Sequence, residues 1–206
     1  MNDPSGAPRE NVSATPVENV AGIGPRNRAL RALNTDGHRL CLRIYLVVVV
    51  AHWAEHIVQA VQVYVLDWPV PEARGVLGIP FPWLVTSEWM HYGYAFVMLV
   101  GLLLLLPGFH GRSRAWWTAS LLLQVWHHFE HLILLVQVTN GANIGGGDAP
   151  VSIVQMLIPR VELHLFYNTV VFVPMAVAMY LHSRPDTAGR EAPGCSCARE
   201  PGRVRG

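Results

Sequence analysis

The sequence predicts an all-α integral membrane protein, built as a four-transmembrane-helix bundle with short interfacial segments in its two extracytoplasmic loops. Hydrophobic residues make up 51% of the 206 residues and charged residues only 14%. The mean hydropathy of +0.29 is too high for an ordinary soluble domain. Four apolar runs are each long enough to cross a bilayer, which takes about 20 helical residues.

The chain divides into two polar tails and one membrane domain. Residues 1–37 contain no sustained apolar run and are predicted to form a disordered cytoplasmic tail. Residues 38–183 form the transmembrane domain, and residues 184–206 are predicted to form a second disordered cytoplasmic tail. The spans are predicted at about residues 40–66, 88–106, 115–138 and 161–181.

Proline and glycine set the boundaries of these spans. The first span ends before residues 67–87, where four prolines and two glycines prevent a helix from continuing. Two tryptophans in this segment favour a position in the membrane interface. Pro107-Gly108 ends the second span, a loop rich in Gly and Asn follows the third, and Pro159 precedes the fourth.

The distribution of arginine predicts the orientation. Arginines flank the start of the first span, the loop between the second and third spans, and the C-terminal tail. The opposite side holds only Arg74 and Arg160. By the positive-inside rule, we predict a multi-pass protein of a bacterial plasma membrane, in contact with lipid, with both termini cytoplasmic.

Seven of the ten histidines lie in or beside the apolar runs: His52, His56, His91, His127, His128, His131 and His164. The first and third spans each carry a histidine pair 13 and 17 residues after an arginine, which is Arg39 or Arg114. The second and fourth spans each carry one histidine, His91 or His164, near their outer ends. All four helices are therefore predicted to deliver histidine to one layer in the outer half of the bilayer. Ionisable groups at that depth are expensive unless they are bound or paired, so this layer is the predicted functional site.

The residue types in this layer indicate a bound metal. Neutral imidazole is the commonest metal ligand, and two histidines four residues apart on a helix can converge on one ion. We predict the seven histidines as ligands, together with Glu88 and Glu162. Glu55 and Glu130 are predicted as catalytic residues that bridge ions, orient an imidazole or shuttle protons.

The predicted function is that of a metal-dependent oxidoreductase of the oxygenase or oxidase type. Its centre would be mononuclear or dinuclear and hold iron or copper, in preference to zinc or haem. We expect an apolar or membrane-borne substrate. The sequence has no nucleotide-binding loop, so electrons would come from an external donor or a quinone. A net charge of +1 gives no reason to expect nucleic acid as a partner, and a homo-oligomer is compatible with the sequence.

This ligand chemistry resembles that of the histidine-rich membrane di-iron desaturases and hydroxylases. Those proteins use HxxHH boxes, whereas this chain has HHxxH starting at His127 and HxxxH starting at His52. The resemblance is therefore one of ligand type and not of family.

Other function classes stay open at this point. A b-type cytochrome would hold haem between two histidines of different helices, although it would use only some of the seven. A metal-handling or transport protein would use the same ligands transiently. A zinc hydrolase would use a glutamate as its base. Outside the spans, Cys195 and Cys197 offer soft ligands in the C-terminal tail.

Overall fold

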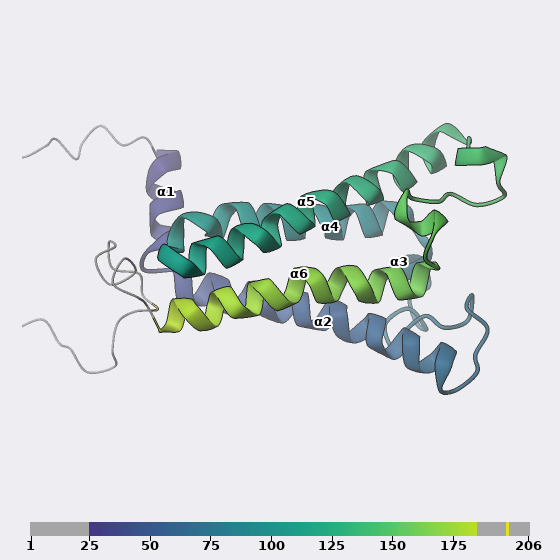
Figure 1. Cartoon of the computed structure of the whole chain (residues 1–206), viewed down its shortest axis with the longest axis horizontal. Helices are drawn as coiled ribbons and strands as arrows, with labels where there is room; N and C mark the ends of the chain where they lie inside the picture. The colour runs from purple at the N-terminus through teal and green to yellow at the C-terminus, as the bar shows by residue number, and fades with distance from the viewer. Residues whose placement is uncertain (1–24, 185–196, 198–206) are drawn as a thin grey trace, which may run out of the picture.

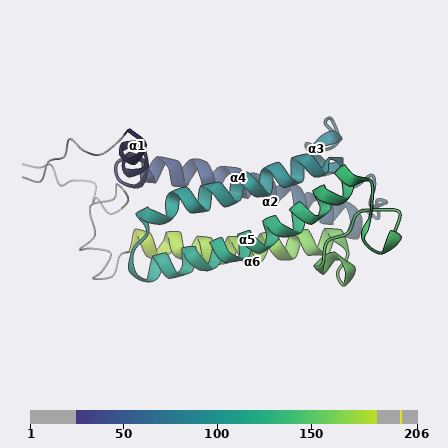
Figure 2. The ribbon, with the colours of Figure 1, turned by 90° about the horizontal axis from the view of Figure 1, so that it is seen from above.

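The structure is a computed structural model that describes residues 25–184 and residue 197. Four long helices run side by side along one axis (Figures 1 and 2). The turn between α4 and α5 and the short helix α1 lie at one end, here called the α1 end. Two long connections, residues 65–87 and 141–159, lie at the other end, here called the loop end. The helical elements are α1 (Pro25–Asn34), α2 (His38–Tyr64), α3 (Trp83–Thr86), α4 (Glu88–Leu105), η2 (Leu106–Gly108), α5 (Gly111–Asn140), η3 (Ile144–Gly146), η4 (Val154–Met156) and α6 (Arg160–Ser183).

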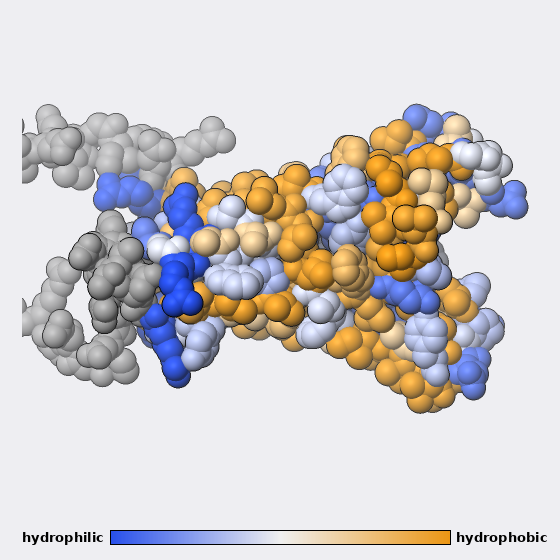
Figure 3. Space-filling model, in the orientation of Figure 1, coloured by the Kyte–Doolittle hydropathy of each residue, from blue (hydrophilic) through white to orange (hydrophobic). Residues whose placement is uncertain are grey.

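The four predicted spans are confirmed as helices. α2, α4 continued by η2, α5 and α6 are each long and apolar enough to cross a membrane. The all-helical class is confirmed too, since the described residues contain no strand. Figure 3 shows apolar side chains over most of the length of the bundle, with a band of hydrophilic ones near the α1 end and others at the loop end. Val47 and Leu122 are 68% and 65% exposed, as expected of side chains that face lipid.

Helix α1 differs from the disordered tail expected for residues 1–37. Asn34, at its last position, is buried and donates hydrogen bonds from Nδ2 to Leu30 O and to Leu104 O on α4, each at 2.9 Å. These contacts dock the end of the short helix on the bundle. The expected tail segments 1–24, 185–196 and 198–206 lie outside the described residues.

The interior of the bundle changes character along its axis. Apolar residues fill the part nearer the α1 end, where Leu102, Phe109, Trp117 and Met175 are completely buried. Nearer the loop end, the buried residues are largely polar: His56, Gln59, Gln62, Glu88, Glu130, His131, Gln137 and His164. The apolar part can hold the four helices together, so packing does not explain why histidines fill the other part.

The two loops contain short helical turns, which are α3 in the first loop and η3 and η4 in the second. Gly141 ends α5 with φ of +65°, a left-handed conformation that glycine adopts without strain. The location of these segments in a membrane interface stays a prediction.

Candidate metal centre

Six of the seven predicted histidine ligands contact one another near the loop end. They are His52 and His56 of α2, His91 of α4, His127 and His131 of α5, and His164 of α6, and together we call them the histidine cluster. Their neighbouring ring centroids are 4.5 to 6.2 Å apart. Each of the four long helices therefore contributes at least one imidazole to a single site.

The seventh histidine, His128, lies apart from this cluster. Its ring packs against Tyr92 and Phe96 of α4, with centroids 4.8 and 5.9 Å away. His128 directly follows His127, so its side chain points about 100° away around the helix. The structure does not bring it to the other six rings.

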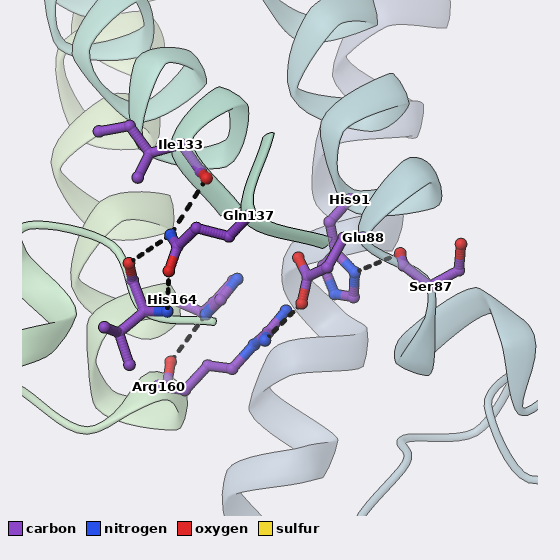
Figure 4. Close-up of polar contacts among 8 residues, drawn as sticks. Ser87, Glu88, His91, Ile133, Gln137, Arg160 and His164 are labelled. Atoms are coloured by element: carbon purple, nitrogen blue, oxygen red, sulfur yellow. Dashed lines mark hydrogen bonds and ion pairs between the residues drawn. The ribbon is translucent and has the colours of Figure 1, made fainter. Parts of the chain in front are cut away.

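Backbone carbonyls orient the histidines of α4 and α6 (Figure 4). His91 Nδ1 donates to Ser87 O at 3.0 Å, and His164 Nδ1 donates to Arg160 O at 2.7 Å. A carbonyl can only accept, so Nδ1 carries the proton and Nε2 of each neutral ring carries the lone pair. Histidines that bind metals are commonly oriented by such a hydrogen bond.

The two histidines of α2 are hydrogen-bonded to each other. His56 Nε2 lies 3.0 Å from His52 Nε2, and His56 Nδ1 lies 2.8 Å from Gln59 Oε1. Two nitrogens that share one ion at about 2.0–2.1 Å are themselves separated by about 3.0–3.4 Å. The spacing of this pair thus suits two ligands of one ion.

Three buried ring nitrogens of the cluster have no hydrogen-bond partner: His127 Nδ1, His131 Nδ1 and His164 Nε2. Outside the cluster, His128 Nδ1 is in the same state. A buried polar atom without a partner costs about 1–3 kcal/mol, so most such atoms in proteins are satisfied. Bound metal ions are one way to satisfy imidazole nitrogens.

The cluster does not form a closed coordination shell as its rings stand. Among residues 25–184 and 197, the one group with three candidate ligand atoms within 4.8 Å of one another is His38, His182 and Cys197 at the α1 end. In the histidine cluster, His52 Nε2 and His56 Nε2 are close enough to share an ion. A third nitrogen would reach the same ion only after rotation of a histidine side chain.

Two cavities border the cluster. The cavity toward the apolar core is lined by His52, His91, His127, His131, Tyr94 and Tyr167, among others. The cavity toward the first loop is lined by His56, His91, His164, Glu88 and Arg160, with Val70 and Pro71 of the loop. His91 faces both cavities, so the cluster lies between them.

The two carboxylates predicted as ligands differ in position. Glu88 is buried beside the cluster, and its Oε1 pairs with Arg160 Nη1 at 2.6 Å (Figure 4). Its Oε2 has no hydrogen-bond partner. Glu162 lies in the first turn of α6 and lines neither cavity. Glu88 is therefore the carboxylate that the structure brings to the site.

The carboxylates predicted as catalytic are turned toward the loops. Glu55 Oε2 accepts a hydrogen bond from Val76 N at 2.8 Å. Glu130 accepts from Ser152 Oγ at 2.5 Å and from Val154 N at 3.2 Å. Each carboxylate therefore holds the loop that follows its own helix, and the catalytic role of both residues stays a prediction.

Two glutamines complete this anchoring in the same manner. Gln62 donates to Gly75 O at 3.2 Å and accepts from Gly75 N at 2.8 Å. Gln137 donates to Val151 O at 2.8 Å and accepts from Val151 N at 3.3 Å (Figure 4). Each glutamine thus pairs with both backbone groups of one loop residue.

These parallels reveal an internal repeat that the initial sequence reasoning missed. The first half, α2 to α4, and the second half, α5 to α6, place equivalent residues at equivalent positions. The pairs are Tyr45 and Ser120, His52 and His127, Glu55 and Glu130, His56 and His131, Gln62 and Gln137, His91 and His164, Tyr94 and Tyr167, and Met98 and Val171. The signal was present in the sequence as His-x-x-Glu-His at 52–56 and 127–131, each with glutamine seven residues after the glutamate.

Equivalent contacts follow from the equivalent positions. The His52 ring stacks on Tyr94 at 3.6 Å between centroids, and the His127 ring lies 4.4 Å from that of Tyr167. Between the halves, His56 packs on His164 at 5.1 Å and His131 on His91 at 5.9 Å. The cluster is therefore assembled from two similar halves, and its ring contacts cross from one half to the other.

Comparisons of this chain with protein families, characterised proteins and solved structures gave no match.

Proposed function

We propose that the histidine cluster binds one or two transition-metal ions and that the protein is an integral-membrane, metal-dependent oxidoreductase. The observation that carries the proposal is the set of buried ring nitrogens without partners on His127, His131 and His164. They lie in a group of imidazoles drawn from four apolar helices. Such groups persist in an apolar interior when something binds them.

The spacing of the rings suits a metal ion, and His91 and His164 are oriented for coordination. Two imidazoles on one ion, with metal–nitrogen distances of about 2.0–2.1 Å, have centroids about 4.5–6.5 Å apart. The cluster spans 4.5 to 6.2 Å. The backbone carbonyls that hold His91 and His164 leave their Nε2 lone pairs available for coordination.

The donor set favours a redox-active ion. Six imidazoles with one nearby carboxylate, that of Glu88, exceed the four ligands of a closed zinc site. Imidazole suits iron and copper, and these metals supply electron transfer and oxygen chemistry when bound.

The surrounding residues position the ligands and exclude water. Glu55, Gln62, Glu130 and Gln137 tie both loops to the helices that carry the histidine pairs. The cavity toward the first loop has a volume of about 340 Å³, and Val70, Val85 and Val161 line part of it, so an apolar substrate from the membrane would reach the cluster there. Electrons come from an external donor or a quinone.

Metal analysis of the detergent-purified chain tests the proposal. We expect bound iron or copper in the native chain and its loss in His127→Ala and in His131→Ala. The matched control is His128→Ala, which removes a neighbouring imidazole outside the cluster and should leave the metal content unchanged. Unchanged metal content in both cluster variants, with the fold intact by circular dichroism, would contradict the proposal.

An optical spectrum of the same preparation separates the remaining function classes. An intense Soret band would identify haem and overturn the proposed non-haem centre. Metal that exchanges freely, with no redox change on addition of a reductant, would favour a transport role instead.

A further inference from the structure

We propose a second metal site at the α1 end, formed by His38, His182 and Cys197 and selective for a thiolate-binding ion, Zn²⁺ or Cu⁺. One ligand atom from each residue lies within 4.8 Å of the other two. The site lies beyond the apolar core from the histidine cluster, and it is independent of the function proposed for that cluster.

The two imidazoles are held in place by the bundle. His38 is the first residue of α2 and is completely buried, and His182 lies in the last turn of α6 and is 8% exposed. Their ring centroids are 5.2 Å apart. Phe109 packs against both rings, at 5.4 Å from His38 and 4.7 Å from His182.

The backbone at Gly108 leaves room for the His38 ring. A Cβ atom built at Gly108 would lie 2.4 Å from His38 Cε1, a distance that real side chains do not tolerate. Glycine at this position is therefore required for the observed place of the imidazole. The chain thus forms a fitted recess for His38.

Cys197 completes the group from the C-terminal segment. It is half-buried and packs against the apolar core, and its carbonyl oxygen accepts a hydrogen bond from Arg39 Nη2 at 3.4 Å. Its neighbour in the predicted soft-ligand pair, Cys195, lies outside the described residues.

The ligand types determine the class of ion. A thiolate with two imidazoles suits Zn²⁺ or Cu⁺ and disfavours Mg²⁺ and Ca²⁺, which take oxygen ligands. In a tetrahedral zinc site the ligand atoms lie about 3.3–3.7 Å apart, so small side-chain rotations would close the group on an ion. Binding would release the thiol proton and would link the start of α2, the end of α6 and Cys197.

Cobalt titration of the full-length protein tests this site, because Co²⁺ bound to a thiolate absorbs in the near ultraviolet and Co²⁺ bound to histidine alone does not. We expect the thiolate band in the native chain, displaced by Zn²⁺ or Cu⁺ and not by Mg²⁺. Cys197→Ser should abolish the band. His182→Gln should weaken Co²⁺ binding by more than the roughly 10–100-fold that is typical when a residue only hydrogen-bonds to a metal ligand. Absence of the band in the native chain would overturn the inference.

Three control variants separate this site from others in the chain. Cys41→Ser and Cys195→Ser should each keep the band, and a band that depends on either of them and survives Cys197→Ser would contradict the assignment. His131→Ala, in the histidine cluster, should also keep the band. Cys197→Ser should leave the metal content of the histidine cluster unchanged, so that the failure of one site is distinguishable from the failure of the other.

Discussion

The two halves of the bundle carry histidine, glutamate, glutamine and tyrosine at equivalent positions, yet the ring nitrogens of their histidine pairs have different hydrogen-bond partners. In the first half, His52 and His56 bond to each other, and His56 bonds also to Gln59. In the second half, His127 and His131 each keep a buried nitrogen without a partner. Under the proposed metal binding, the second half would therefore supply the ligands that gain most from an ion, whereas the histidines of the first half already hydrogen-bond to protein groups.

The largest expected effect is on metal binding, when the histidine nearer the loop end in each pair, His56 or His131, is replaced by alanine. We expect His131→Ala to weaken metal binding by more than about 100-fold, which exceeds the usual effect of losing a residue that only hydrogen-bonds to a metal ligand. His56→Ala should weaken it less, since that ring already has protein partners. Equilibrium titration of the metal-free protein measures both, and equal losses would show that the halves contribute symmetrically.

The ion pair between the halves gives the next effect. Arg160→Met leaves the buried Glu88 carboxylate without its partner, which should lower the free energy of unfolding by about 3 kcal/mol. Arg160→Lys should retain most of the stability, and the double variant Arg160→Met with Glu88→Met should recover part of the loss. Unfolding in detergent measures all three; an unchanged stability of Arg160→Met would show that the pair contributes nothing.

The loop anchors should differ between the halves because their burial differs. Glu130 is 2% exposed, whereas Glu55 is half-buried. We expect Glu130→Gln to lower stability by about 1.5–3 kcal/mol and Glu55→Gln by about 1 kcal/mol. Hydrogen exchange should show faster exchange at Val154 N in the first variant and at Val76 N in the second. Lost redox activity with unchanged exchange at these amides would instead support the catalytic role predicted from sequence.

The smallest effect is expected where the halves use different residues for the same bond. Tyr45 Oη donates to Met98 O, and Ser120 Oγ donates to Val171 O, both at 2.8 Å. Tyr45→Phe and Ser120→Ala should each lower the free energy of unfolding by about 1 kcal/mol, the usual net value of one hydrogen bond. Thermal unfolding of the two variants checks this. If the loss in free energy of unfolding differs between them by more than a factor of two, the two hydrogen bonds are not equivalent.

Much of the fold could be predicted because hydropathy and helix breakers depend on local sequence. The span predicted at about residues 88–106 matches α4, Glu88–Leu105, and its end follows from Pro107. The convergence of histidines also followed from helical rise, since the pairs in α2 and α5 lie at the same distance from an arginine.

The roles of individual side chains could not be predicted in this way. Whether Glu130 faces an ion or a loop depends on where Ser152 lies, and that position is set by the path of an irregular loop. His128 was indistinguishable from His127 until the rotation of α5 against α4 was known. His38 and His182 lie 144 residues apart in sequence, so only the folded bundle brings them together.

The most direct test of the account is X-ray absorption at the edge of the bound metal, recorded on the Cys197→Ser chain so that the α1-end site cannot contribute. We expect a first shell of nitrogen and oxygen ligands with metal–nitrogen distances of about 2.0–2.1 Å and the outer scattering of several imidazole rings. His131→Ala should lower that imidazole scattering, and His128→Ala should not. A spectrum without imidazole scattering, or one that is the same in both variants, would contradict a metal centre in the histidine cluster.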